Sequence, residues 1–184
     1  MLIAPLQLGC SILAAGNTRA FSRQRFSIMA KSTVVVDVRE SRVGQGVFAR
    51  RNFRNDQVIG EILGEVFDSN IYTSNYCMEL AHNRSLEPIA PYRFLNHSCE
   101  PNCELFYYDA EEDGSPPVSL WLQAIRAVPM GEELTIDYAW PADAAVPCQC
   151  GAATCRGWIV DPEELPAVLE QQDAVVVGNC GRVL

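Results

Sequence analysis

The chain has 184 residues, of which 48% are hydrophobic and 20% are charged. This length and composition are typical of one soluble globular domain whose core is stable without disulfide bonds. Residues 1–32 contain no acidic side chain, so the rest of the chain carries all 23 acidic residues against ten basic ones. That excess argues against a protein that binds nucleic acid through its phosphates. It suits a basic polypeptide partner, or it serves solubility alone.

The first 30 residues differ from the rest of the chain. Residues 1–30 are acid-free, contain arginine and serine, and are mildly hydrophobic. This composition resembles an organelle transit peptide, and it fits equally well an upstream extension with a natural start at Met29. Gln7 and Gly9 interrupt the hydrophobic stretch, which is too short to span a bilayer. We place the segment outside the fold and expect a nuclear or cytoplasmic protein, with an organelle as the alternative if the segment is a transit peptide.

The body of the chain begins with short β-strand patterns separated by turns. Residues 33–38 form a β-branched run, residues 41–46 a glycine-rich turn, and residues 47–53 an alternating pattern. Residues 57–68, QVIGEILGEVFD, predict two strands that pair with each other around Gly64.

Further strands are predicted in the middle of the chain. Residues 75–80 form a short strand pattern, whereas residues 82–92 contain two prolines and are expected to be a loop. Residues 103–109 and 118–128 predict a hairpin, joined by an acidic loop rich in glycine and proline. Residues 134–138 predict one more short strand.

Helical periodicity is confined to the end of the chain. Residues 162–172, PEELPAVLEQQ, are the best helix candidate, and Pro166 limits it to short pieces. The sequence therefore predicts a mostly β protein with irregular connections.

Three of the eight cysteines are spaced like metal ligands. Cys148, Cys150 and Cys155 lie in PCQCGAATCRG, where small residues allow a sharp bend between the thiols. Because a closed zinc site is tetrahedral, a fourth ligand is needed. The alternative interpretation is a set of small buried cysteines without a metal. The candidates for the fourth ligand are Cys77, Cys99, Cys103, Cys180 and His97.

Five sequence blocks occur in an order that points to one family. They are VGQGVFA (43–49), GEILGEV (60–66), RFLNHSCEPNC (93–103), GEELTIDY (131–138) and CQCGAATCRGW (148–158). The GQG turn alone would be a weak signal and the three-cysteine knuckle alone a moderate one, but the ordered set of five is specific because each block is rare and their spacing agrees. The chain resembles the SET-domain protein lysine methyltransferases that carry a post-SET zinc motif.

The resemblance implies a fold and a division of the chain. The expected fold is mostly β, with small sheets and a knot-like crossing of the NHSC and DY segments, followed by a post-SET zinc knuckle. The expected units are an N-terminal extension at 1–30, a SET domain at 31–140, the zinc knuckle at 146–160 and a C-terminal tail at 161–184.

The same resemblance implies the activity and its residues. The expected reaction is methyl transfer from S-adenosylmethionine to a protein lysine, with a histone-like basic tail as the default substrate and neither nucleic acid nor membrane as a direct partner. Tyr138 would be catalytic, orienting the amine. The implied cofactor-binding residues are Gly44, Gln45, Gly46, Tyr76, Arg93, Asn96, His97 and Trp158. The implied Zn²⁺ ligands are Cys99, Cys148, Cys150 and Cys155.

Some positions depart from the family's pattern. Ile62, Met78 and Ile136 stand where the family commonly has aromatic residues that line the lysine channel. These aliphatic residues in place of aromatic ones leave the degree of methylation open. They also motivate an alternative, a non-catalytic SET module that binds cofactor or peptide. Glu132 and Glu133 are interpreted as turn and surface residues.

Overall fold

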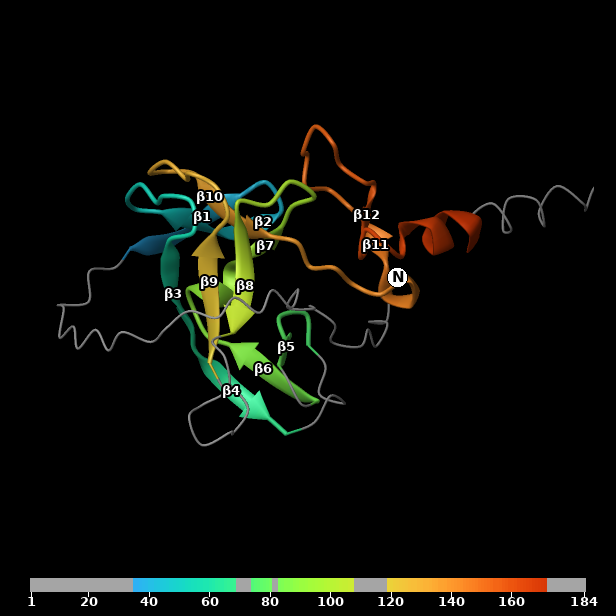
Figure 1. Cartoon of the computed structure of the whole chain (residues 1–184), viewed down its shortest axis with the longest axis horizontal. Coiled ribbons are helices and arrows are strands. Elements are labelled where there is room, and N and C mark those ends of the chain that lie inside the picture. Colours follow the sequence, from blue (N-terminus) through green and yellow to red (C-terminus); the bar gives the residue numbers. More distant parts are fainter. Residues whose placement is uncertain (1–34, 69–73, 81–82, 108–118, 172–184) are drawn as a thin grey trace, which may run out of the picture.

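The computed structural model describes residues 35–68, 74–80, 83–107 and 119–171. The acidic loop predicted between residues 109 and 118, and the segment 1–30, lie outside this described part. In Figure 1 one sheet lies at the top, one at the bottom, a third joins them, and a small two-stranded ribbon stands to one side. The expected mostly β class is confirmed.

The first sheet has the strand order β1-β2-β10-β7. A tight turn joins β1 (Val36–Ser41) to β2 (Gly44–Ala49), and the two strands pair antiparallel along their whole length. β10 (Glu133–Ile136) pairs with β2, and its other edge pairs in parallel with β7 (Asn96–His97). The glycine-rich turn predicted before residue 47 is therefore the end of this hairpin, although its last three residues already belong to β2.

The second sheet has the order β3-β9-β8. β8 (Cys103–Tyr107) and β9 (Leu120–Ala124) form an antiparallel hairpin, which confirms the hairpin predicted from their sequences. β3 (Val58–Ile62) adds to the other edge of β9.

The third sheet, with the order β4-β6-β5, corrects two predictions. β4 (Gly64–Phe67) pairs with β6 (Arg84–Pro88), so the pairing predicted between β3 and β4 is wrong. A Cβ on Gly64 would overlap the Glu87 backbone, so this glycine lets the chain leave one sheet and enter the next. β6 also falls in the segment predicted as a loop. It can be a strand because Pro88, which lacks an N–H, is its last residue.

The remaining elements are short and lie in the middle and the C-terminal part of the chain. β5 (Met78–Leu80) confirms the strand predicted there, and β11 (Val146–Pro147) pairs with β12 (Trp158–Ile159). Residues 165–171 form the predicted helix, which tolerates Pro166 because it lies in the first turn. Two 3₁₀ turns, η1 (Tyr92–Phe94) and η2 (Ala142–Ala144), precede β7 and β11.

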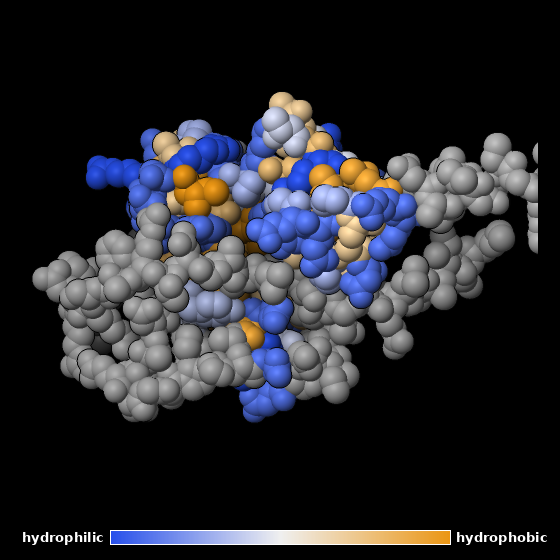
Figure 2. All heavy atoms as spheres, turned by 45° about the vertical axis from the view of Figure 1, so that its right-hand side comes forward, coloured by the Kyte–Doolittle hydropathy of each residue, from blue (hydrophilic) through white to orange (hydrophobic). Residues whose placement is uncertain are grey.

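A continuous core joins the sheets. Strand side chains such as Val47, Leu122, Leu134 and Ile136 are almost completely buried in it. The exposed hydrophobic side chains are scattered, and Figure 2 shows them as small areas within a hydrophilic face. Within the described residues, no helix is long and apolar enough to cross a membrane.

Candidate functional site

The site forms where two segments distant in sequence run side by side. Asn96 and His97 in β7 pair with Thr135 and Ile136 in β10. The chain beyond β10 then carries Tyr138 past His97, whose Nδ1 accepts a hydrogen bond from the Tyr138 backbone N–H at 3.2 Å. The NHSC and DY segments therefore lie against each other, as the crossing expected for the fold requires.

Asn96 is fixed by three acceptors. Its Nδ2 lies 2.7 Å from Glu133 Oε1, 2.9 Å from the Gln45 carbonyl oxygen and 3.1 Å from Ser41 Oγ. The interpretation of Glu133 as a surface residue is wrong, because its carboxylate turns inward to this amide. A Cβ on Gly46 would overlap the Glu133 carboxylate, so this glycine makes room for an acidic side chain.

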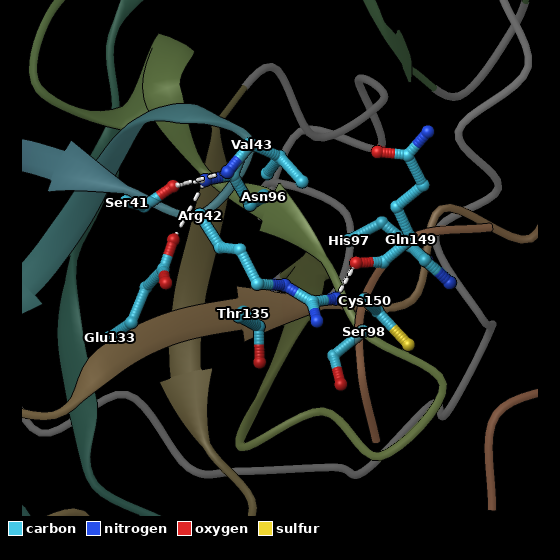
Figure 3. Close-up of a pocket in the computed structure, with 10 residues that line it drawn as sticks. All are labelled: Ser41, Arg42, Val43, Asn96, His97, Ser98, Glu133, Thr135, Gln149 and Cys150. Carbon is cyan, nitrogen blue, oxygen red and sulfur yellow. Dashed lines mark hydrogen bonds between the residues drawn. The ribbon is translucent and has the colours of Figure 1, made fainter.

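A pocket opens beside Asn96 (Figure 3). Arg42, from the β1–β2 turn, extends along it and donates a hydrogen bond to the Gln149 carbonyl oxygen. The pocket thus lies between the first sheet and the cysteine segment. Its lining residues are Ser41, Arg42, Val43, Asn96, His97, Ser98, Glu133, Thr135, Gln149 and Cys150.

Tyr138 is held on several sides. Its hydroxyl donates a hydrogen bond of 2.6 Å to the Leu95 carbonyl oxygen, and its ring packs against the rings of His97 and Trp140. Burial raises the pKa of Tyr138 above its usual value, and the charges of Tyr76 and Glu133 act in the same direction. The side chain is therefore a neutral phenol at physiological pH, able to donate or accept a hydrogen bond and unable to serve as a strong base.

Four thiols meet next to this tyrosine. Cys99 Sγ lies 3.8 Å from Cys148 Sγ and 3.9 Å from Cys155 Sγ, and Cys150 Sγ is 3.5 Å from the Cys99 backbone nitrogen. A tetrahedral zinc ion with Zn–S bonds of about 2.3 Å would separate its sulfur ligands by about 3.8 Å. The observed spacing therefore fits one zinc ion. Cys103 is fully buried in β8 and is not in this group.

His97 lies close enough to be considered a ligand as well. Its Nε2 is 3.4 Å from Cys99 Sγ, and the two belong to one metal-compatible group with Cys148 and Cys150. However, its Nδ1 accepts the Tyr138 N–H, so the neutral ring carries its proton on Nε2 and donates it toward Cys99. Burial, opposed by Asp137, lowers the pKa of His97 to about 4 and keeps the ring neutral. His97 therefore supports the thiol cluster from outside.

Arg156 connects the cysteine segment to the tyrosine segment. Its guanidinium forms two contacts of 2.8 Å with the two carboxylate oxygens of Asp137, and it also donates to the Val160 carbonyl oxygen at 3.0 Å. Its backbone N–H points to Cys99 Sγ at 3.4 Å. Because Asp137 precedes Tyr138, this ion pair anchors the tyrosine segment to the cluster.

The remaining predicted cofactor residues lie at the edges of the site. Gly44, with φ +119°, and Gln45 open β2 next to the pocket. Arg93 stacks on the Tyr76 ring, with its Cζ 4.2 Å from the ring centroid, and Trp158 lies on the β11–β12 ribbon. Among the described residues, the side chains that line the pocket do not include Tyr76, Arg93 or Trp158.

The comparisons with known proteins agree with this arrangement. A family model described as "SET domain" matches residues 44–139, more than half of the chain. The chain belongs to the SET-domain family. A histone-lysine N-methyltransferase, H3 lysine-4 specific, of Schizosaccharomyces pombe is 33% identical over 130 residues, which are 62% of this SET-domain chain and 14% of the relative.

Other relatives and structures extend the comparison. Histone-lysine N-methyltransferase mes-4 of Caenorhabditis elegans is 30% identical over 138 residues, 62% of this chain and 15% of the relative. A crystal structure of KRYPTONITE in complex with DNA, an H3(1-15) peptide and SAH has a TM-score of 0.58, with 23% identity over 67% of this chain and 29% of that one. This likeness establishes the SET fold. The chain spans only a small part of the curated relatives.

Sequence reasoning missed three side chains of the site. Arg42 directly precedes the first block and Arg156 lies within the last one, yet nothing in their spacing indicates where their side chains point. Glu133 lies in a recognised block and could have been found by asking which face of β10 it occupies. Because Leu134 and Ile136 are buried core residues of that strand, Glu133 and Thr135 must face the opposite side.

Proposed function

We propose that this chain is an S-adenosylmethionine-dependent protein lysine N-methyltransferase that acts on a histone-like basic tail. The observation that carries the proposal is the parallel pairing of β7 with β10, which brings Asn96 and His97, both of which line the pocket, together with Tyr138. A histone substrate is supported by the names of the relatives and would imply action in the nucleus.

The methyl donor would bind beside Asn96. S-adenosylmethionine supplies an activated methyl group, so the protein needs neither a metal nor a covalent intermediate for the transfer. The pocket formed by the hairpin turn, β7, β10 and the cysteine segment offers amide, carboxylate and guanidinium groups to the donor's polar end. Gly44 and Gln45 open the strand that closes one side of it.

Tyr138 would orient the acceptor lysine. A lysine ammonium, with a pKa of about 10.4 in water, must lose its proton before it can accept a methyl group. A desolvated site next to the donor's positive charge favours the neutral amine. The neutral Tyr138 hydroxyl, held by the Leu95 carbonyl, is suited to position that amine, and positioning alone can be worth roughly 7–11 kcal/mol of a barrier.

Zinc would close the site from the C-terminal side. The spacing of the four thiols fits a structural ion held by Cys99, Cys148, Cys150 and Cys155. Cys99 lies two residues after β7, so the ion would tie the crossing to the knuckle and keep the pocket wall at Gln149 in place.

The alternative is a non-catalytic SET module that binds cofactor or peptide. It rests on the aliphatic residues Ile62, Met78 and Ile136 at expected channel positions, and all three side chains are almost completely buried in the core. Methyl transfer, with cofactor binding measured beside it, distinguishes the two functions.

The decisive test is methyl transfer by the full chain. Purified protein with zinc retained would be given tritiated S-adenosylmethionine and either core histones or a lysine-rich extract. We expect label on a histone band and its loss, by at least about a hundredfold, in Tyr138→Phe. Label confined to the extract would move the substrate away from histones. Cofactor binding without label on any protein would refute the enzymatic activity.

A further inference from the structure

A group of arginines lies at the end of the first sheet that points away from the pocket. Residues 41–55 contain four arginines and no acidic residue, and this run ends at Asp56. Three of the four, Arg50, Arg51 and Arg54, are exposed in the loop between β2 and β3. Figure 1 shows this loop at the left end of the first sheet, away from the β11–β12 ribbon. We call these three residues the arginine loop.

The guanidinium groups of the arginine loop are free to bind a ligand. Within the part of the chain that the structure describes, none of them forms an ion pair, whereas the exposed Arg39 pairs with Asp37 at 3.0 Å. Arg51 Cζ lies 4.9 Å from the centroid of the Phe53 ring. Stacking of this kind orients a guanidinium and leaves its N–H groups able to donate.

The backbone of the arginine loop is fixed by its neighbours. Phe53 is only 2% exposed and exchanges two backbone hydrogen bonds with Val128, of 2.8 and 3.0 Å. The Met130 backbone N–H donates a hydrogen bond of 2.7 Å to Asn52 Oδ1. Because the backbone is already ordered, a ligand that binds here has only the arginine side chains to immobilise.

The surroundings do not cancel the positive charge. The segment packed against the loop, residues 119–131, has no acidic side chain, and Glu132 after it is paired with Arg126 at 2.5 Å. The Arg50 backbone N–H donates to the Val35 carbonyl oxygen at 3.0 Å, so the chain enters the fold beside the arginine loop. The sequence that leads to this point also has four basic residues and no acidic one in its first 32 positions.

This surface fits the phosphates of a nucleic acid. A guanidinium binds a phosphate through two parallel hydrogen bonds. On the proposed function, the substrate is a histone, and histones are wrapped in DNA. Resting on that function, we propose that the arginine loop binds the phosphate backbone of double-stranded DNA without reading its sequence. The acidic excess of the whole chain argued against such a partner, but the uneven distribution of charge removes that argument for this surface.

The position of the arginine loop is compatible with catalysis on a tail. The strand β2 separates the loop from the pocket, and at about 3.3 Å per residue its length is roughly 20 Å. DNA on the loop therefore leaves the pocket open. A flexible basic tail that extends from a DNA-wrapped histone can cover this distance with fewer than about ten extended residues.

The test measures DNA binding as a function of salt. Fluorescence anisotropy would give association constants of the full zinc-loaded chain for a labelled mixed-sequence duplex of about 20 base pairs, between about 50 and 200 mM salt. The main variant carries Arg50→Gln, Arg51→Gln and Arg54→Gln together. A second variant carries lysine at the same three positions and keeps the charge. The matched control is Arg39→Gln, whose guanidinium is already paired.

The expected result is a change of salt dependence. Each phosphate contact contributes about 0.9 to the slope of log K against log salt, so the glutamine variant should have a slope shallower by about 2.7. Between about 50 and 200 mM salt, the wild type should then lose roughly 40-fold more affinity than this variant. The lysine variant and Arg39→Gln should keep the wild-type slope. Because all the changed side chains are exposed, the melting temperatures should agree.

Methyl transfer provides a second readout. The glutamine variant should label free core histones as the wild type does, and should label DNA-wrapped histones at least about tenfold more slowly at subsaturating substrate. Equal rates of the two proteins on wrapped histones would contradict the proposed surface.

The remaining outcomes separate the possible partners and the two proposals. No binding of the duplex by the wild type at about 50 mM salt, or an equal slope in the glutamine variant, overturns the assignment of DNA. Poly-L-glutamate that binds more tightly than the duplex, and does so only with the arginines present, overturns it in favour of an acidic polypeptide. If DNA binding depends on the arginines and no histone is labelled by the wild type, the proposed function falls while the DNA-binding surface stands.

Discussion

The ion pair between Arg156 and Asp137 predicts a coupling between the cysteine knuckle and the segment that carries Tyr138. Arg156→Gln would leave the Asp137 carboxylate without its partner at a position where the side chains are only 14% and 24% exposed. Breaking a buried pair costs about 3–5 kcal/mol, and the partial exposure of Asp137 reduces the expected loss of unfolding free energy to roughly 2–4 kcal/mol.

The matched control is a second arginine–carboxylate pair in the same domain. Arg126 contacts Glu132 at 2.5 Å but is 49% exposed, so Arg126→Gln should cost no more than about 1 kcal/mol. Urea unfolding of the zinc-loaded variants would give the free energies, with zinc content checked in each. The double variant with Asp137→Asn should be less destabilised than the sum of the single changes. Equal losses for Arg156→Gln and Arg126→Gln, or strict additivity in the cycle, would refute the coupling.

Three further predictions address other parts of the site. Cys99→Ser should lower the zinc content below one ion per chain and reduce the melting temperature, because a closed zinc site contributes directly to folding. One tightly bound zinc ion and an unchanged melting temperature would contradict the ligand set. Gly46→Ala should displace the Glu133 carboxylate, lower the free energy of unfolding by about 1–3 kcal/mol and weaken the binding of S-adenosylhomocysteine. If the alanine changes neither the stability nor the binding, the carboxylate can move out of its way. Asn102→Ala should cost about 2–4 kcal/mol in urea unfolding, because its buried amide bonds the Glu132 carboxylate and the Thr135 N–H, while the exposed Asn55→Ala should stay within about 0.5 kcal/mol.

The parts of the fold that follow local patterns were predictable from the sequence. The hairpin of β8 and β9 has two alternating strands on either side of a loop rich in glycine and proline, and such neighbours in sequence usually pair. The ordered family blocks then identified the crossing and the cysteine cluster. The closeness of Cys99 to Cys148 across 49 positions could come only from the resemblance, because spacing alone left five candidates for the fourth ligand.

The failures share a physical cause, which is that strand partners and side-chain directions are set by tertiary packing. The run from Val58 to Phe67 contains two strands next to each other, and both find their partners elsewhere in the chain. β6 was hidden because a proline within a pattern argues against a strand, and its position at the strand end removes that conflict. Glu133 was assigned to the surface from its residue type, although the alternation along β10 directs it into the pocket.

The position of Tyr138 depends on the cysteine cluster through two separate links. One link is His97, which accepts the tyrosine's N–H on one side of its ring and reaches Cys99 with the other. The other is Arg156, which joins Asp137 to the knuckle. Loss of Arg156 leaves the first link intact, so Arg156→Gln should lower turnover without abolishing it. Loss of Cys99 removes the sulfur atom that both His97 Nε2 and the Arg156 backbone N–H contact. It should therefore impair turnover more than Arg156→Gln does, even at a temperature where both variants remain folded.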